Sequence, residues 1–296
     1  MRQVGLLFIC EALTRTSSMM VFMSIALTGR RMAPDASLAT LPLALVPVAM
    51  TIATIPAAQM MRRYGRRAGF QLAAMLGIAG ASTCVVALWL DQFIVLCAGG
   101  FLIGSVNGFA TYYRFAAGEV APEEYRSRAI SLVMAGGVIA AFVGAALATA
   151  TKELHPSAPF LGTFAAIACV QALILIVVSF SRLPKPVAGE TQGGGRSLGE
   201  LAARPTFLLA VLGAVASWGL MSLLMNATPL SMERHQHSFG DTAQVIQWHV
   251  LGMYVPSFFT GSLIRRFGER PILFFGVALI GLSTALNLLG LEVIHY

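Results

Sequence analysis

Charge is what this sequence has least of. Only 11% of its 296 residues are Asp, Glu, Lys or Arg, whereas 57% are hydrophobic and the mean hydropathy is +0.76. A soluble domain carries about a quarter charged residues, so the composition excludes an ordinary soluble protein and indicates an integral membrane protein. The net charge of +7 would suggest a nucleic-acid partner in a soluble chain, but the placement of the basic residues gives another explanation.

Cysteine is scarce, and motifs for catalysis or nucleotide binding are missing from the sequence. Cys10, Cys84, Cys97 and Cys169 each lie in an apolar run without C-x-x-C spacing, which is typical of packing residues. The sequence contains no P-loop, H-E-x-x-H, G-x-S-x-G or dinucleotide-binding fingerprint. It therefore predicts no enzyme, no ATP-driven pump and no cofactor. His235 and His237 are interpreted as surface histidines rather than as a metal site.

Long apolar runs are abundant instead. A membrane-spanning helix needs about 20 mostly apolar residues. Runs of this kind cover residues 5–28, 38–61, 69–90, 93–114, 129–150, 159–181, 206–230, 242–264 and 271–291. The sequence thus predicts an all-α integral membrane protein, a polytopic helical bundle of nine spans. Because Glu11 and Arg15 interrupt the first run and no cleavage site follows it, we expect it to remain as a span rather than to act as a signal peptide.

The basic residues predict the orientation. With the N-terminus in the cytoplasm, the inner segments hold fourteen Arg and Lys residues, whereas the outer loops hold only Arg30, Arg31, Lys152 and Arg234. This bias follows the positive-inside rule and predicts a multi-pass protein of a bacterial-type inner membrane. It also explains the net positive charge without any nucleic-acid partner.

A stretch rich in Gly, Pro and charge interrupts the spans after the sixth. It predicts an N-terminal six-helix bundle (1–181), a cytoplasmic linker (182–205) and a partial C-terminal bundle of three helices (206–296). The segment LGELAAR within the linker predicts a short surface helix.

A short arginine motif occurs twice. RRYGRR begins at Arg62 after the second span, and RRFGER begins at Arg265 after the eighth, 203 residues and six spans later. Both copies read Arg-Arg-aromatic-Gly-x-Arg and lie in short inner loops. Their matching positions on either side of a linker indicate two related transporter halves.

These loops resemble the signature of the major facilitator superfamily, G-x-x-x-D-R-x-G-R-R. The matching residues are Arg63, Gly65, Arg66 and Arg67 in the first copy and Gly261, Arg266, Gly268 and Arg270 in the second. The segment EVAPEEYRSRAIS (119–131) is similar to the family's loop between the fourth and fifth spans. The chain departs from the family at Arg62 and Arg265, which stand where the family has an Asp. The family fold has twelve spans, so the nine seen here predict either a fragment or a shortened protein.

The resemblance implies a secondary active transporter that moves a small organic solute by alternating access, as a monomer among membrane lipids when full-length. NATPLSM (226–232) and the segment 245–268 look like a bacterial subgroup that includes riboflavin transporters. Uptake and efflux both stay open. The alternative is a scaffold or remnant that transports nothing, because both six-span halves are needed to enclose a pathway.

Ionisable and polar residues within the first and fourth spans are candidates for a substrate or proton site, since such groups are costly in a membrane. Glu11 and Arg15 lie on one helix face. Glu11 is expected to carry a coupling proton or Arg15 to meet an anionic solute, unless the pair only neutralises itself. Asn107, Thr111 and Arg114 share a face with Gly100 and Gly104 in the fourth span. Arg114 is expected either in the cavity or at the lipid headgroups, with Tyr112 and Tyr113 beside it.

The later spans add further candidates. Asn226 precedes Pro229, where the sequence predicts either a break or a tolerated kink of the helix. Gln244, Gln247 and Tyr254 share a polar face, which we expect to line the cavity. His249 points nearly the opposite way and is expected to be a packed histidine.

Overall fold

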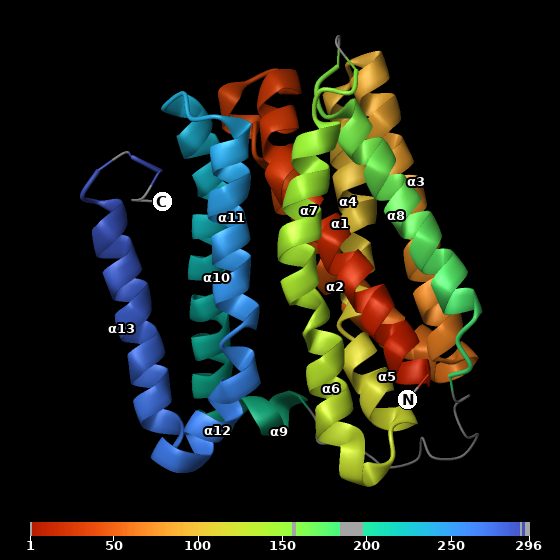
Figure 1. Cartoon of the computed structure of the whole chain (residues 1–296), viewed down its shortest axis with the longest axis vertical. Coiled ribbons are helices and arrows are strands. Elements are labelled where there is room, and N and C mark those ends of the chain that lie inside the picture. Colours follow the sequence, from red (N-terminus) through yellow and green to blue (C-terminus); the bar gives the residue numbers. More distant parts are fainter. Residues whose placement is uncertain (1, 156–157, 184–197, 291, 294–296) are drawn as a thin grey trace.

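The protein folds as a bundle of long helices, as the sequence predicts (Figure 1). This computed structural model describes residues 2–155, 158–183, 198–290 and 292–293, and every regular element among them is helical. The first group comprises α1 (Arg2–Met32), α2 (Leu41–Tyr64), α3 (Arg66–Leu90), α4 (Phe93–Ala110), α5 (Tyr113–Val120), α6 (Arg126–Met134), α7 (Gly136–Thr151) and α8 (Leu161–Ser179). After the short α9 (Leu198–Ala202), the second group comprises α10 (Pro205–Arg234), α11 (Phe239–Tyr254), α12 (Ser257–Phe267) and α13 (Glu269–Asn287).

Eight stretches of the described residues are long and apolar enough to cross a membrane, one fewer than the sequence predicts. The difference lies in the run 242–264, which forms α11 and α12 with a break at Val255 and Pro256. These helices have 16 and 11 residues, so neither counts as a span by itself. Pro256 lacks the N–H that would continue the α11 hydrogen-bond ladder. Pro229, where the sequence predicts a break or a kink, lies within the continuous α10.

The helices form two groups that lie side by side (Figure 1). We call α1–α8 the first half and α10–α13 the second half, and we call the end of the bundle that holds the C-terminal end of α1 the upper end. α9 lies where the sequence predicts a short helix. The boundaries 1–181, 182–205 and 206–296 stay a prediction, and residues 184–197 of the expected linker lie outside the described residues.

Glycines let α2 and α4 approach closely. A Cβ atom at Gly104 would lie 2.4 Å from the carbonyl oxygen of Val46, and one at Gly100 would lie 2.6 Å from that of Pro42. Both distances are far below van der Waals contact, so a larger residue at either position would push the helices apart. The close packing brings the polar residue Asn107, on the next turn of α4, to the interior of the first half.

The two copies of the arginine motif have the same backbone shape. Gly65 ends α2 and begins α3 with φ 89° and ψ 161°, and Gly268 ends α12 and begins α13 with φ 83° and ψ 167°. These φ values lie in the region that favours glycine. The sequence repeat is therefore also a structural repeat, as two related halves require.

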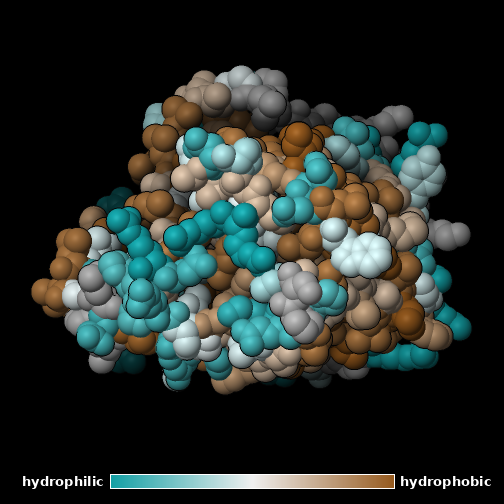
Figure 2. Space-filling model, turned by 90° about the horizontal axis from the view of Figure 1, so that it is seen from above, coloured by the Kyte–Doolittle hydropathy of each residue, from teal (hydrophilic) through white to brown (hydrophobic). Residues whose placement is uncertain are grey.

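The sides of the bundle are apolar. Trp89, Ile94 and Leu288 are 78%, 80% and 83% exposed, which suits contact with lipid rather than with water. Figure 2 looks down on the upper end, where hydrophilic side chains are concentrated and hydrophobic side chains form much of the outline. This distribution is typical of a bundle that spans a membrane.

Candidate functional site

A cavity of about 490 Å³ lies between the two halves. The first half lines it from α1, α2, α4, α5, α6 and α7, and the second half lines it from α10 and α11. The lining residues are Glu11, Arg15, Ser18, Met19, Phe22, Val46, Pro47, Met50, Asn107, Ala110, Thr111, Arg114, Met134, Ala140, Trp218, Met221, Ser222, Met225, Asn226, Val250, Met253 and Tyr254. Since both halves contribute, a shift of one half against the other would reshape the cavity.

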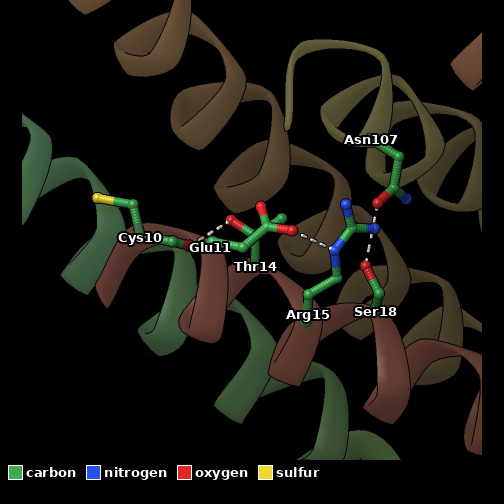
Figure 3. A network of polar contacts seen from close by, with 6 residues as sticks. All are labelled: Cys10, Glu11, Thr14, Arg15, Ser18 and Asn107. Atoms are coloured by element: carbon green, nitrogen blue, oxygen red, sulfur yellow. Dashed lines mark hydrogen bonds and ion pairs between the residues drawn. The ribbon is translucent and has the colours of Figure 1, made fainter. Parts of the chain in front are cut away.

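The polar end of the cavity is built on α1. Arg15 Nε donates to Glu11 Oε1 at 2.7 Å, one helical turn apart (Figure 3). The Glu11 side chain is 2% exposed, and its other oxygen, Oε2, has no hydrogen-bond partner in the described part of the chain. Arg15 is 24% exposed. The ion pair therefore satisfies only one of the two carboxylate oxygens and leaves the outer part of the guanidinium facing the cavity.

Ser18 fixes the orientation of Asn107. Ser18 Oγ, one turn above Arg15, donates to Asn107 Oδ1 of α4 at 3.1 Å (Figure 3). An amide whose oxygen accepts this bond keeps its Nδ2 group as a donor for other partners. Asn107 is 9% exposed, and both residues line the cavity. The polar end is thus rich in donors.

Methionine and aromatic side chains form the rest of the wall. Six of the fourteen methionines line the cavity. They are Met19, Met50, Met134, Met221, Met225 and Met253. Phe22, Trp218 and Tyr254 add aromatic surface. Thioether side chains are adaptable and polarisable, so this wall can fit flat apolar ligands of different outline. These methionines are not among the site residues predicted from the sequence, although the M-x-x-x-M spacing of Met221 and Met225 places both on one helix face.

The structure brings most of the sequence candidates to the cavity. Glu11, Arg15, Asn107, Thr111, Arg114, Asn226 and Tyr254 all line it. Arg114 also lies over the ring of Phe115, 4.8 Å from its centroid. Asn226 Oδ1 is buried without a hydrogen-bond partner among the described residues. The cavity therefore joins candidates that lie more than 200 residues apart in the sequence.

The two tyrosines beside Arg114 do not line the cavity. Tyr113 is 2% exposed and stacks on Phe70 inside the first half, with ring centroids 4.2 Å apart. Tyr112 donates its hydroxyl to the Thr54 carbonyl at 3.3 Å and lies under the Arg66 guanidinium. The end of α4 turns at this point, so both rings point away from the cavity.

The glutamine face of α11 is also placed outside the cavity, contrary to the prediction from the sequence. Gln244 is exposed, and neither it nor Gln247 is among the lining residues. The α11 residues that face the cavity are Val250, Met253 and Tyr254, on the neighbouring stripe. The way α11 packs on α7 selects this stripe, and helix periodicity alone cannot reveal it.

His249 lies four residues before Met253, on the same side of α11. Its Nε2 atom is buried and has no hydrogen-bond partner in the described residues. Burying a polar atom without a hydrogen-bond partner costs folding free energy, so such atoms are rare in folded proteins. In the described part of the chain, no group of three or more His, Cys, Asp and Glu side chains is arranged to hold a metal ion, so a metal at this place would need methionine ligands.

The motif loops lie at the lower end of the bundle. Arg66 binds both Glu119 oxygens through one guanidinium edge, with Nη2–Oε1 at 2.5 Å and Nε–Oε2 at 3.1 Å. Arg62, Arg63, Arg67, Arg266 and Arg270 are exposed, whereas the burial of Gly261 and Arg265 is outside what the structure describes. The Arg66–Glu119 pair fastens the start of α3 to the end of α5.

Side chains of the two halves meet at the upper end. Arg30 Nη1 and Glu233 Oε2 lie 2.7 Å apart and connect α1 with α10. Phe160 and Phe239 pack edge to face with centroids 5.5 Å apart, and Lys152 Nζ lies 4.9 Å from the Phe239 centroid. These contacts join the two halves at the upper end.

Comparison with known proteins agrees with this architecture. The family model described as "Major Facilitator Superfamily" matches residues 7–292. The riboflavin transporter RfnT of Brucella anthropi is 38% identical over 297 residues, which cover 100% of this chain and 75% of that protein. The uncharacterised transporter YdeG of Bacillus subtilis is 26% identical over 263 residues, which cover 83% of this chain and 61% of that one. A D-xylose–proton symporter structure shares the fold with a TM-score of 0.68 at 12% identity, over 99% of this chain and 76% of its own.

Proposed function

Because the chain belongs to the major facilitator superfamily, we propose that it is a secondary active transporter that moves a small organic solute by alternating access. The observation that carries this proposal is the cavity, which both halves line, together with the ion pair that joins the halves at the upper end. A cavity of about 490 Å³ lies within the range of about 300–1,000 Å³ that small-molecule sites occupy. The protein thus provides a site at the place where rocking halves would expose it to either side.

The wall suits an aromatic or heterocyclic solute. Trp218, Phe22 and Tyr254 offer ring surfaces, and the α1 end offers hydrogen bonds. Since the relative from Brucella anthropi is a riboflavin transporter, riboflavin is the first solute to test. We propose in addition an inner-membrane location with a cytoplasmic N-terminus, which the distribution of Arg and Lys supports.

Proton coupling through Glu11 is the second part of the proposal. Glu11 Oε2 is buried and unpartnered among the described residues, so a proton can settle there and weaken the bond to Arg15. Protonation would then free Arg15 for the solute. We expect the parent to accumulate riboflavin in proteoliposomes in response to a pH gradient, and Glu11→Gln to accumulate it no better with the gradient than without. Equal gradient dependence in parent and variant would contradict a role of Glu11.

A second candidate function is transport of a soft metal ion, and the methionines of the second half favour it. Met221 and Met225 share a face of α10, and Met253 faces the same cavity from α11. His249, one turn before Met253, holds a buried Nε2 without a partner in the described residues, but it is not among the residues that line the cavity. Thioether ligands select soft ions such as Cu(I). This arrangement would bind the ion as cargo.

The metal candidate predicts a measurable affinity. Purified protein is titrated with Ag(I), a stable substitute for Cu(I), and Met221→Leu with Met225→Leu is expected to weaken binding by about tenfold or more. Met232→Leu is the matched control, because Met232 lies on the same helix but outside the cavity lining. Equal affinity of the parent, the double variant and the control would exclude a thioether site.

A further inference from the structure

Resting on the proposed transport of an organic solute, we infer that the α1 end of the cavity recognises an oxyanion, and that the preferred solutes are aromatic molecules with a carboxylate or an equivalent anionic group. The family does not specify the charge of the solute, and riboflavin, the solute named for one relative, carries no charge near neutral pH, so the inference departs from that relative. The inference depends on the open edge of Arg15, the orientation of Asn107 and the charge balance of the cavity.

Arg15 uses only part of its guanidinium within the protein. Nε donates to Glu11 Oε1, and no described residue accepts a hydrogen bond from Nη1 or Nη2. In Figure 3 the end that carries these two nitrogens points away from Glu11, toward Ser18 and Asn107. Two adjacent nitrogens with free N–H groups form the planar fork that binds a carboxylate through two parallel hydrogen bonds.

Asn107 adds a donor beside this fork. Because Ser18 Oγ donates to its Oδ1, the amide turns Nδ2 rather than the oxygen to its remaining neighbours. Ser18 is therefore a positioning residue, which holds the amide in the orientation that favours an acceptor. Among the polar groups at this end, the single carboxylate, Glu11, is already engaged by Arg15.

The charge balance points to a negative ligand. The ionisable groups that line the cavity are Glu11, Arg15, Arg114 and Tyr254. One carboxylate against two guanidinium groups leaves a net charge of +1 when Tyr254 is neutral. No carboxylate of the described residues lies within ion-pair distance of Arg114. Arg114 is an exposed residue, so water can solvate part of its charge, and an anionic solute would balance the net positive charge of the lining.

The test compares an acid with its neutral isostere. Naphthoate and naphthamide have the same ring system, and their binding to the purified full chain is measured by calorimetry near neutral pH. We expect naphthoate to bind at least about tenfold more tightly than naphthamide, because a charge-assisted pair of hydrogen bonds replaces a neutral one. Equal affinities, or no saturable binding of naphthoate, would overturn the inference.

Matched variants assign the preference to Arg15. The double variant Glu11→Gln with Arg15→Gln removes the pair without leaving a buried charge, and it is expected to bind both probes alike. Arg31→Gln removes the same charge from the upper end of the same helix, outside the cavity lining, and should keep the preference. If Arg31→Gln loses the preference for naphthoate as fully as the double variant does, the preference reflects overall charge and the inference fails.

Two further arms separate related explanations. A lipid phosphate offers the same oxyanion chemistry as a carboxylate solute. If phosphatidylglycerol displaces naphthoate, and naphthoate and naphthamide bind with equal affinity, the site binds lipid and the inference is overturned. The second experiment measures uptake of both probes into proteoliposomes.

Uptake without preference for naphthoate would overturn the inference and leave the proposed transport intact. Preferential binding without uptake of any solute would support the inference and contradict the transport.

Discussion

Arg15→Ala is expected to destabilise the folded protein by about 3–5 kcal/mol, the usual effect of removing one partner of a buried ion pair. The Glu11 carboxylate is 2% exposed, and its only ion pair in the described residues is with Arg15, at 2.7 Å. Without the guanidinium, this carboxylate must stay charged in an apolar bundle or take up a proton. The change in the free energy of unfolding is measured by adding a denaturing detergent to protein purified in a mild detergent.

The opposite substitution provides the control. Glu11→Gln leaves Arg15, whose side chain is 24% exposed to the cavity, so the remaining charge is less deeply buried and the loss should be smaller. Combining Glu11→Gln with Arg15→Ala should recover much of the stability, because no unpaired charge remains. If the midpoint of the unfolding transition is the same for Arg15→Ala and the parent, Glu11 and Arg15 do not form a buried ion pair.

Cross-linking the upper end is expected to stop transport. Arg30 and Glu233 belong to different halves and meet at 2.7 Å, so cysteines at these positions can be joined by a short, reducible reagent. If the halves must separate at this end in each cycle, the cross-link should lower uptake by roughly tenfold or more, and reduction should restore it. Uptake of the solute carried by the parent is followed in proteoliposomes.

A cross-link within one half is the matched control. Arg31→Cys and Asp35→Cys both lie in the first half, at the end of α1 and just after it. Both pairs are made in a chain with Cys97→Ser and Cys169→Ser, because these native cysteines are not fully buried. Full uptake with the Arg30–Glu233 pair cross-linked would argue that this end does not open.

The sequence predicted local features well. Long apolar runs predicted the helices, because length and hydropathy are local properties. The two arginine motifs were predicted to lie in short loops between spans, and their glycines, Gly65 and Gly268, have positive φ where one helix ends and the next begins. The spacing of Glu11 and Arg15 predicted their contact, because residues four apart on a helix are neighbours whatever surrounds them.

Features that depend on how helices dock were not predicted. The Arg66–Glu119 and Arg30–Glu233 pairs join residues 53 and 203 positions apart. No local sequence pattern predicts such pairs. The cavity methionines resemble ordinary core residues in the sequence. On α11 the face that carries Gln244 is the more polar in sequence, and it was expected to line the cavity. In the structure Gln244 is exposed, and the neighbouring face with Met253 lines the cavity instead.

A carrier of this architecture takes up a solute in the cavity from one side of the membrane and releases it on the other. Counterflow measures this exchange. Proteoliposomes loaded with an excess of unlabelled solute receive a trace of the same solute in labelled form, for riboflavin, naphthoate and Ag(I) in turn. A carrier should give a transient accumulation of label above equilibrium for at least one of them. Simple equilibration without overshoot for all three, in protein shown to be folded by its unfolding transition, would contradict carrier function.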